Sequence, residues 1–254
     1  EEKLHEQQRK LSMVQKFGSI SLVVGGMVHN FNNLLTRILG NINLAKMNSK
    51  PGSDIFEALT NAEKSSEQVK GLIKRLFTFF EEGEPVKETI TIRGLLKDAV
   101  TFVVSGSKAK AVFSLPDNLW LVDCNVRQIS EAFNNVIFNA VQAMPEGGTI
   151  TISAENVTVD ATHRILPKQG KYVKISIKDE GVGIPSENLP KLFDPYFTTK
   201  EKGTGLGLAI THFIIKKHEG YIGVQSEEGV GTIVTIYLPA SEKKSPDRTK
   251  GKKF

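Results

Sequence analysis

A histidine on an amphipathic segment is the first residue of this sequence whose type and setting suit chemistry. Apolar residues recur at alternating steps of three and four, which predicts a helix with one apolar seam. They are Phe17, Ile20, Val24, Met27, Phe31, Leu34 and Ile38. At about 100° per residue, His29 lies roughly 170° from the mean direction of this seam, close to Gly25 and Gly26. Glycine costs about 1 kcal/mol relative to alanine inside a helix, so two glycines here call for a reason. One reason is that a bulky partner must come close to the imidazole, which is a good nucleophile when neutral. Considered without the rest of the sequence, the helix fits an exposed surface histidine even better.

A second set of polar residues lies in a helix predicted over residues 125–143. Glu131, Asn135 and Asn139 recur every four residues and therefore share one face of this helix. Asparagine is a poor helix former, so two asparagines on one stripe beside apolar residues indicate a functional face. An amide oxygen is a suitable ligand for Mg²⁺ alongside triphosphate oxygens.

Three glycine-bearing segments lie in the second half of the chain. Asp179–Gly183 follows a predicted strand, where glycines allow a tight turn and a buried carboxylate can accept a hydrogen bond from an exocyclic amine such as that of adenine. Gly203–Gly207 precedes a predicted helix whose N–H groups and dipole favour a phosphate, with Lys200 nearby to add charge. Gly229–Thr232 is expected to be only a hairpin turn. The sequence contains no Walker A loop, and the glycine runs do not lie in a βαβ unit as a Rossmann fingerprint would.

Helical periodicity dominates the first third of the chain. The first seam ends in a turn over residues 48–53, where Asp54 is expected to cap a second helix with its own seam from Ile55 to Phe80. Two long amphipathic helices with a short connection predict an antiparallel hairpin. One hairpin cannot cover both seams, so we expect two chains to form a four-helix bundle as a homodimer.

The periodicity changes after a charged hinge over residues 81–85, which contains Gly83 and Pro85. Strands are expected at 86–92, 112–115, 120–123, 148–156, 171–179, 221–226 and 231–238, and helices at 93–103, 125–143 and 205–218. This mixture predicts an α/β sandwich with helices on one face of a sheet. The expected organisation is a helical-hairpin domain over 1–83, an α/β domain over 84–240 and a basic, disordered tail over 241–254.

Composition excludes several classes of protein. A single cysteine, Cys124, excludes a disulfide scaffold and a cysteine-based zinc cluster, and fits a reducing compartment. The net charge of +5 is concentrated in residues 241–254, so the rest of the chain is nearly neutral and lacks the basic footprint of a nucleic-acid binder. No apolar run approaches the roughly 20 residues of a membrane span. Because the chain starts at Glu1 without an initiator methionine or a signal peptide, we expect a cytoplasmic fragment of a longer protein, without direct membrane insertion of the fragment.

Taken together, these motifs resemble the transmitter region of a bacterial sensor histidine kinase of a two-component system. The resemblance covers nearly all of residues 10–240, and five boxes occur in the family's order and spacing. His29–Asn33 resembles the phosphoacceptor box, Asn135–Ala140 the N box, Asp179–Gly183 the G1 box, Phe193–Phe197 the F box and Gly203–Gly207 the G2 box. The resemblance implies a dimeric helical-hairpin domain followed by a Bergerat-type ATP-binding domain.

The same resemblance implies a chemistry and a set of site residues. ATP and Mg²⁺ would be the cofactors, His29 would be phosphorylated, and the phosphoryl group would pass to an aspartate on a separate or downstream response-regulator receiver domain. Asn139 would hold Mg²⁺ with support from Asn135 and Glu131, and Asp179 would bind the adenine amine. Residues 184–204 would form a mobile ATP lid. The implied nucleotide-binding positions are Asn135, Asn139, Gln142, Asp179, Gly181, Gly183, Ile184, Phe193, Phe197, Lys200, Gly203, Thr204, Gly205, Leu206, Gly207, Leu208 and Thr232.

The phosphoacceptor box departs from its subtype at one position. The residue after the histidine is usually acidic in this subtype, whereas Asn30 stands here and cannot accept the imidazole proton at neutral pH. Slow autophosphorylation, or proton loss to water, would follow. Asn33 resembles the position that orients a hydrolytic water in members with phosphatase activity.

Three other functions remain open on the sequence. A pure ATPase of the gyrase type would carry a water-activating glutamate one turn before the metal-binding asparagine, where this chain has Asn135. A degenerate kinase could bind nucleotide and serve as a non-catalytic signalling scaffold, which Asn30 alone supports. A mitochondrial-type protein kinase of the same superfamily would not need the intact His29 box.

Overall fold

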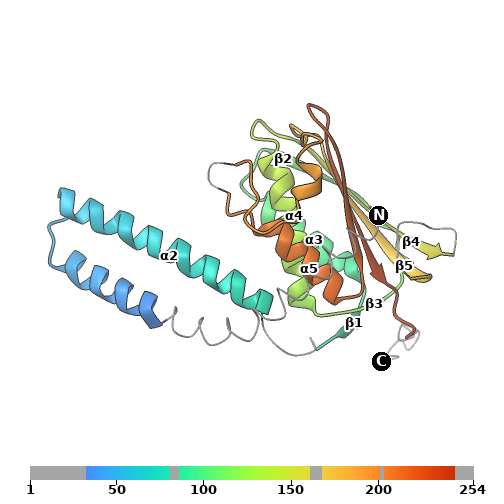
Figure 1. Cartoon of the computed structure of the whole chain (residues 1–254), viewed down its shortest axis with the longest axis horizontal. Coiled ribbons are helices and arrows are strands. Elements are labelled where there is room, and N and C mark those ends of the chain that lie inside the picture. The colour runs from blue at the N-terminus through green and yellow to red at the C-terminus, as the bar shows by residue number, and fades with distance from the viewer. Residues whose placement is uncertain (1–32, 81–85, 161–167, 201–202, 244–254) are drawn as a thin grey trace, which may run out of the picture. The chain divides into compact units, whose positions relative to one another are not determined.

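A computed structural model describes residues 33–80, 86–160, 168–200 and 203–243 (Figure 1). The chain divides into two compact units, Glu1–Glu84 and Pro85–Phe254. His29, Asn30 and most of the first apolar seam lie outside the described residues, as does the greater part of the basic tail.

The first unit is a helical hairpin, as the periodicity predicted. A helix over residues 33–47 is followed by a turn and then by α2 (Asp54–Phe80). The expectation that Asp54 caps α2 is wrong, because Asp54 is already the first helical residue. The cap is Ser53, whose hydroxyl oxygen accepts a hydrogen bond from the backbone N–H of Phe56 at 3.3 Å.

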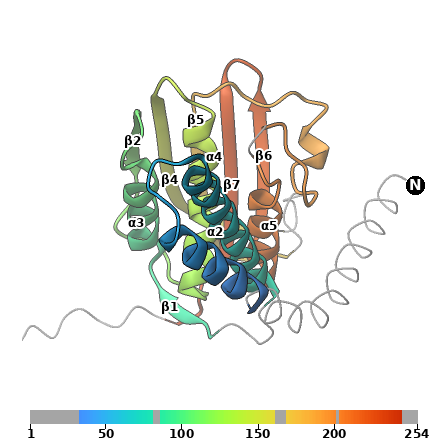
Figure 2. The ribbon, with the colours of Figure 1, turned by 90° about the vertical axis from the view of Figure 1, so that its left-hand side faces the viewer.

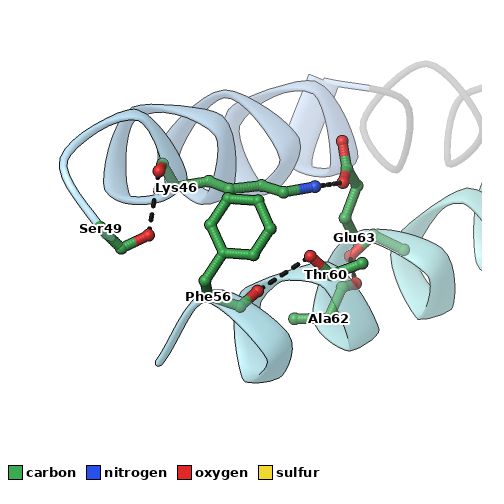
Figure 3. A network of polar contacts seen from close by, with 7 residues as sticks. Lys46, Ser49, Phe56, Thr60, Ala62 and Glu63 are labelled. Atoms are coloured by element: carbon green, nitrogen blue, oxygen red, sulfur yellow. Dashed lines mark hydrogen bonds and ion pairs between the residues drawn. The ribbon is translucent and has the colours of Figure 1, made fainter. Parts of the chain in front are cut away.

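A polar contact joins the two helices of the hairpin near the turn (Figure 3). The Lys46 ammonium lies 2.6 Å from a Glu63 carboxylate oxygen and 5.2 Å from the centroid of the Phe56 ring. Lys46 lies three turns after Leu35 on the same stripe of its helix, and Leu35 is buried. Leu34 and Ile38, the two members of the predicted seam within the described residues, lie on a more exposed face, since Leu34 is 53% exposed and Ile38 is 47% exposed.

The second unit is an α/β sandwich built on a mixed five-stranded sheet. Its strand order is β2-β4-β5-β7-β6, in which β2 is parallel to β4 and all other neighbours are antiparallel. The strands are β2 (Ala109–Ser114), β4 (Gly148–Val159), β5 (Gly170–Asp179), β6 (Tyr221–Glu227) and β7 (Gly231–Pro239). A separate antiparallel pair joins β1 (Glu88–Ile90) to β3 (Val122–Cys124).

Three helices cover one face of this sheet, which confirms the predicted layering (Figures 1 and 2). They are α3 (Ile92–Val104), α4 (Val126–Gln142) and α5 (Gly207–Lys217), and α4 packs between the other two. A short 3₁₀ turn, η1, spans Leu189–Lys191. The predicted strand over 86–92 is too long, because Thr91 is the N-cap of α3 and Ile92 is its first residue.

Alternating side chains of the sheet and one face of each helix form the core between the layers. Ile175 and Ile177 of β5 are fully buried two residues apart, which is the period of a strand with one buried face. Phe133 and Ile137 of α4 are fully buried four residues apart and lie on the face opposite the polar row. Burial of this apolar face orients α4, and thereby places Asn135 and Asn139 on the opposite side of the helix from Phe133 and Ile137.

Candidate functional site

The polar row of α4 supplies the first part of the site. Asn125 caps the helix, since its side-chain oxygen accepts from the N–H of Gln128 at 3.0 Å. Ten residues later, nearly three turns along the helix, Asn135 Nδ2 donates to the carbonyl oxygen of Gly207 at 3.3 Å. Glu131, Asn135 and Asn139 are all half-buried, as a row at the edge of the buried face should be.

A lysine from the segment before the second glycine run lies on this row. Lys200 Nζ donates to Asn139 Oδ1 at 3.2 Å and to Gln142 Oε1 at 2.7 Å. Desolvation lowers the pKa of Lys200, and the negative charge of Asp179 partly opposes this shift. The amide oxygens of Asn139 and Gln142 therefore already hold a cation.

Asp179 ends β5 and is only 5% exposed. Its Oδ1 accepts hydrogen bonds from the backbone N–H groups of Gly181 at 2.9 Å and Thr232 at 3.2 Å. Burial raises the pKa of Asp179, while these two hydrogen bonds and the charge of Lys200 act in the opposite direction. The carboxyl group is thus held rigidly at the end of a central strand.

The loop after Asp179 needs its glycines because backbone approaches it on two sides. A Cβ at Gly181 would lie 2.5 Å from the Cβ of Ala143, at the end of α4. Gly183 has a φ of +71°, and a Cβ there would collide with the carbonyl of Glu227. Val182 N–H donates to the carbonyl of Ala143 at 3.1 Å, which attaches this loop to α4.

The β6–β7 hairpin contributes more than the turn that was expected of it. Its turn conformation is confirmed, but its backbone also packs on the Asp179 loop, because Gly229 N–H donates to Val182 O at 2.8 Å. Ser226 joins the two segments, since its hydroxyl accepts from Ile184 N–H and lies 2.9 Å from Thr232 Oγ1. Sequence reasoning missed Ser226, which carries no motif signal of its own.

The second glycine run leads into the N-terminus of α5. Gly205 has a φ of +65°, and a Cβ there would collide with the backbone of Tyr196. Tyr196 itself has a φ of 67°, and its N–H donates to Gly205 O at 3.0 Å. The N-cap residue Leu206 provides no side-chain hydrogen bond to the first turn of α5. The backbone N–H groups in the first turn of α5 therefore receive no capping side chain from Leu206 and are suited to bind an anion.

The remaining predicted site residues lie in the second glycine run, at the start of α5 and in the segment just before the run. Thr204 is exposed, whereas Gly203, Leu206 and Leu208 are half-buried. Phe193 stacks on the ring of His212 in α5, with centroids 4.9 Å apart and planes inclined by 29°. Phe197 is half-buried. His212 is a further residue that sequence reasoning missed, because a histidine on the partly apolar α5 gave no signal before its neighbour was known.

The C-terminal half of α4 is where these segments meet. Ala143 contacts the Asp179 loop, Asn139 contacts Lys200, and Asn135 contacts the start of α5. Asn33 belongs to the other unit, where it is exposed on the helix over 33–47. A hollow of about 1340 Å³ lies apart from these residues and is lined by Thr89, Trp120 and Tyr172 among others.

The donor atoms present suit a cation held jointly with a ligand. No group of three or more histidine, cysteine, aspartate or glutamate side chains is arranged to hold a metal ion in the described part of the chain. The amide oxygen of Asn139 and the carboxylate oxygens of Glu131 are hard donors of the kind that Mg²⁺ prefers. Asn139 Oδ1 also accepts a hydrogen bond from the ammonium group of Lys200. The residues therefore fit a Mg²⁺ ion whose other ligands come from phosphate and water.

Residues 124–242 match the family of histidine kinase-, DNA gyrase B- and HSP90-like ATPases. The fold and the site thus define an ATPase-type nucleotide-binding domain. Similar solved structures include full-length ShkA in complex with AMPPNP, with a TM-score of 0.70 and 21% identity over 89% of this chain and 47% of that one. The catalytic domain of histidine kinase ThkA has a TM-score of 0.51 and 26% identity over 61% of this chain and 95% of that one.

Sequence relatives extend this likeness over both units. Sensor kinase CckA of Brucella abortus is 34% identical over 94% of this chain and 26% of its own length. Sporulation kinase E of Bacillus subtilis is 28% identical over 94% of this chain and 31% of its own length. The chain, which spans only about a quarter to a third of these relatives, belongs to the sensor histidine kinases as a transmitter region. Among the helices described here, none combines the length and apolar character that a membrane crossing requires.

Proposed function

We propose that the chain is a histidine kinase core that transfers the γ-phosphoryl group of ATP to His29 and then to an aspartate of a response-regulator receiver domain. One observation carries the nucleotide half of this proposal. The amide row of α4, the buried Asp179 and the glycine-rich start of α5 converge around the C-terminal half of one helix. That convergence combines an acceptor for an amine, a helix N-terminus for phosphate and hard oxygen donors for a cation.

Each residue has a defined part in holding the nucleotide. Asp179 accepts a hydrogen bond from the adenine amine, and the N–H groups at the start of α5 bind phosphate oxygens. Asn139, supported by Asn135 and Glu131, would hold Mg²⁺, which when bound offsets the charge of the phosphates. Lys200, already on the amide row, supplies a further positive charge to the same region.

His29 is the phosphoryl acceptor in this proposal. Neutral Nε2 forms a bond to the γ-phosphorus as the bond from that phosphorus to the ADP oxygen breaks, and the ring proton leaves to solvent. Asn30 can hydrogen-bond to the imidazole but takes no proton from it at neutral pH. Reduced autophosphorylation is the expected consequence, so Asn30→Asp should increase the yield of phosphohistidine.

A second copy of the chain completes the helical unit. Leu34 and Ile38 belong to the predicted seam and stay about half exposed within one hairpin. Burial of both seams in a four-helix bundle removes this apolar surface from water. The homodimer is therefore part of the proposed catalytic unit.

Labelled ATP tests the proposal directly. The chain is incubated with γ-labelled ATP and Mg²⁺ beside His29→Ala, with His5→Ala as a matched histidine control. Acid-labile, alkali-stable label should appear in the wild type and in His5→Ala and be absent from His29→Ala. Label that persists in His29→Ala would refute His29 as the acceptor. Nucleotide binding without any label would instead favour the non-catalytic scaffold.

Phosphatase activity is the second candidate function, because Asn33 is exposed one turn after His29. A side chain in that position can orient a water for attack on a phosphorylated receiver. Asn33→Ala should slow release of phosphate from a phosphorylated receiver domain while leaving formation of phosphohistidine intact. Equal release rates for both proteins would remove this activity from the proposal.

A further inference from the structure

We propose that His218 is a positioning residue that fixes the register of α4 against α5. Through this register it holds the amide row of α4 opposite the phosphate-binding end of α5. The inference rests on the proposed function, since it concerns the two helices that carry the nucleotide site. His218 itself lies at the other end of α5 and belongs to none of the family boxes described above.

Both ring nitrogens of His218 are engaged by backbone groups. Nε2 accepts a hydrogen bond from Asn125 N–H at 3.0 Å, and Nδ1 lies 2.8 Å from the carbonyl oxygen of Ile214. Because an N–H group can only donate and a carbonyl can only accept, the ring is neutral with its proton on Nδ1. The residue is 3% exposed. Burial lowers the pKa of His218, and the charges of Lys87 and Lys217 act in the same direction, while the Ile214 hydrogen bond opposes them.

The two hydrogen bonds of the ring have different consequences. The bond to Ile214 lies within the last turn of α5 and so concerns that helix alone. The bond to Asn125 crosses to the N-cap of α4, 93 residues away along the chain. Of these two bonds, only the one to Asn125 joins one helix to the other.

Another hydrogen bond joins α4 to α5 at the nucleotide site. Asn135 Nδ2 donates to Gly207 O, at the first residue of α5. From Asn125 to Asn135 the chain advances ten residues along α4, and from Gly207 to His218 eleven residues along α5. At about 1.5 Å per residue these spans are about 15 and 16.5 Å. The two antiparallel helices are thus joined at two points, which are separated by nearly equal distances along α4 and along α5. These two bonds limit how far one helix can slide past the other.

Such a fixed register matters for the nucleotide more than for the core. Side chains between the helices can repack after a small shift, whereas a triphosphate must meet the α4 amides and the α5 N–H groups at once. Binding constellations need support that holds them within about 0.5 Å of the productive geometry. Loss of the Asn125–His218 hydrogen bond should therefore raise the Kd for nucleotide even in protein that remains folded.

Two substitutions separate the two hydrogen bonds of the ring. In His218→Gln the side-chain oxygen can occupy the place of Nε2 and accept from Asn125 N–H, and the bond to Ile214 is lost. In His218→Asn the amide nitrogen can occupy the place of Nδ1 and donate to Ile214, and the bond to Asn125 is lost. Ile215→Val, also on α5 and fully buried, serves as a control that loses packing but no hydrogen bond between the helices.

The experiment measures the Kd of a non-hydrolysable ATP analogue with Mg²⁺, and the thermal midpoint of unfolding, for each variant of the 254-residue chain. We expect His218→Asn to raise the Kd about fivefold to tenfold and His218→Gln to stay within about twofold of the wild type, because one hydrogen bond is worth about 1 kcal/mol. Ile215→Val should lower the thermal midpoint without changing the Kd. A Kd for His218→Asn equal to that of Ile215→Val, or no rescue by glutamine, overturns the inference. Absence of binding by the wild type overturns the proposed function as well, so the two failures are distinct.

A second pair of variants tests the same bond from its other end, and covers the case in which His218→Asn does not fold. Asn125 has a φ of −78°, which lies in the range of proline, and the proline Cδ would replace the hydrogen that Asn125 N–H donates to His218. Asn125→Pro removes the N–H donor and the capping side chain, whereas Asn125→Ala removes only the cap. The Kd should rise about fivefold from alanine to proline, and equal values for the two variants contradict the role of this N–H group.

Discussion

The two units differ in where their apolar surface goes. In the α/β unit, residues of α4 and of the central strands, such as Phe133 and Ile175, are fully buried within one chain. In the described part of the helical unit, Leu35 is buried, while Leu34 and Ile38 of the adjacent seam remain about half exposed. The difference teaches that the α/β unit buries its core within one chain, whereas the hairpin leaves apolar residues exposed, and these are the residues that the proposed dimer would cover.

Removal of a core side chain should have the largest effect, and only on the α/β unit. Phe133→Ala leaves a cavity beneath α4 and should lower the free energy of unfolding of this unit by about 3–5 kcal/mol. Phe102→Ala, at an exposed position of α3, should change it by less than about 0.5 kcal/mol. Urea unfolding followed by the fluorescence of Trp120, the only tryptophan of the chain, reports on this unit. Similar losses for both variants would contradict a self-sufficient core.

A charge in the exposed seam should break the helical unit while sparing the α/β unit. Ile38→Asp places one carboxylate from each copy in the proposed bundle. Burial of each carboxylate should cost about 2 kcal/mol, so dimerisation should weaken several-hundred-fold. Asn43→Asp, at an exposed position on a different face, should leave the dimer intact. Sedimentation at a series of concentrations measures both. A wild-type chain that stays monomeric at high concentration would remove the bundle from the proposal.

Asp179→Asn should separate binding from stability within the α/β unit. The asparagine oxygen can keep both backbone hydrogen bonds, but its amide group faces the adenine amine as a second donor, so nucleotide affinity should fall about 100-fold. Calorimetric titration measures this loss. An affinity close to that of the wild type would exclude Asp179 as the adenine acceptor.

The same variant carries a pH dependence. The pKa of Asp179 is raised in the folded protein, chiefly by burial, so its contribution to stability is present at low pH and is lost as the pH rises through that raised pKa. At pH 7 Asp179→Asn should therefore unfold at a temperature equal to or above that of the wild type. The difference should shrink as the pH is lowered towards 4, and a difference that grows instead would contradict the direction of the shift.

The contact between the two hairpin helices should have the smallest effect. Lys46→Met removes a half-buried ion pair with Glu63 and the interaction with the Phe56 ring, which together should cost about 1 kcal/mol or less (Figure 3). Lys70→Met removes an exposed ion pair with Glu67 and should cost nothing measurable. Thermal unfolding followed by circular dichroism in the helical band compares them. A loss of several kcal/mol from Lys46→Met would mean that the hairpin depends on its own contacts more than on a partner.

Much of the site followed from motifs of a few residues. The spacing of Asn135 and Asn139 placed them on one face of α4, because a helix repeats every 3.6 residues whatever surrounds it. The glycines at 183 and 205 marked loops, and both adopt positive φ in the structure. Ser226, His212 and His218 carried no such signal, because each acquires its role from a neighbour that is distant in the sequence.

Local periodicity and backbone constraints therefore determined, from the sequence alone, which segments are helices and strands and which of their faces are polar. The tertiary structure alone decided that Ser53 rather than Asp54 caps α2, that Lys200 lies on the α4 amides, and that His218 joins α5 to the start of α4. The physical reason is that these contacts require two segments to approach within about 3 Å. Such an approach depends on how whole layers pack, which no short stretch of sequence encodes.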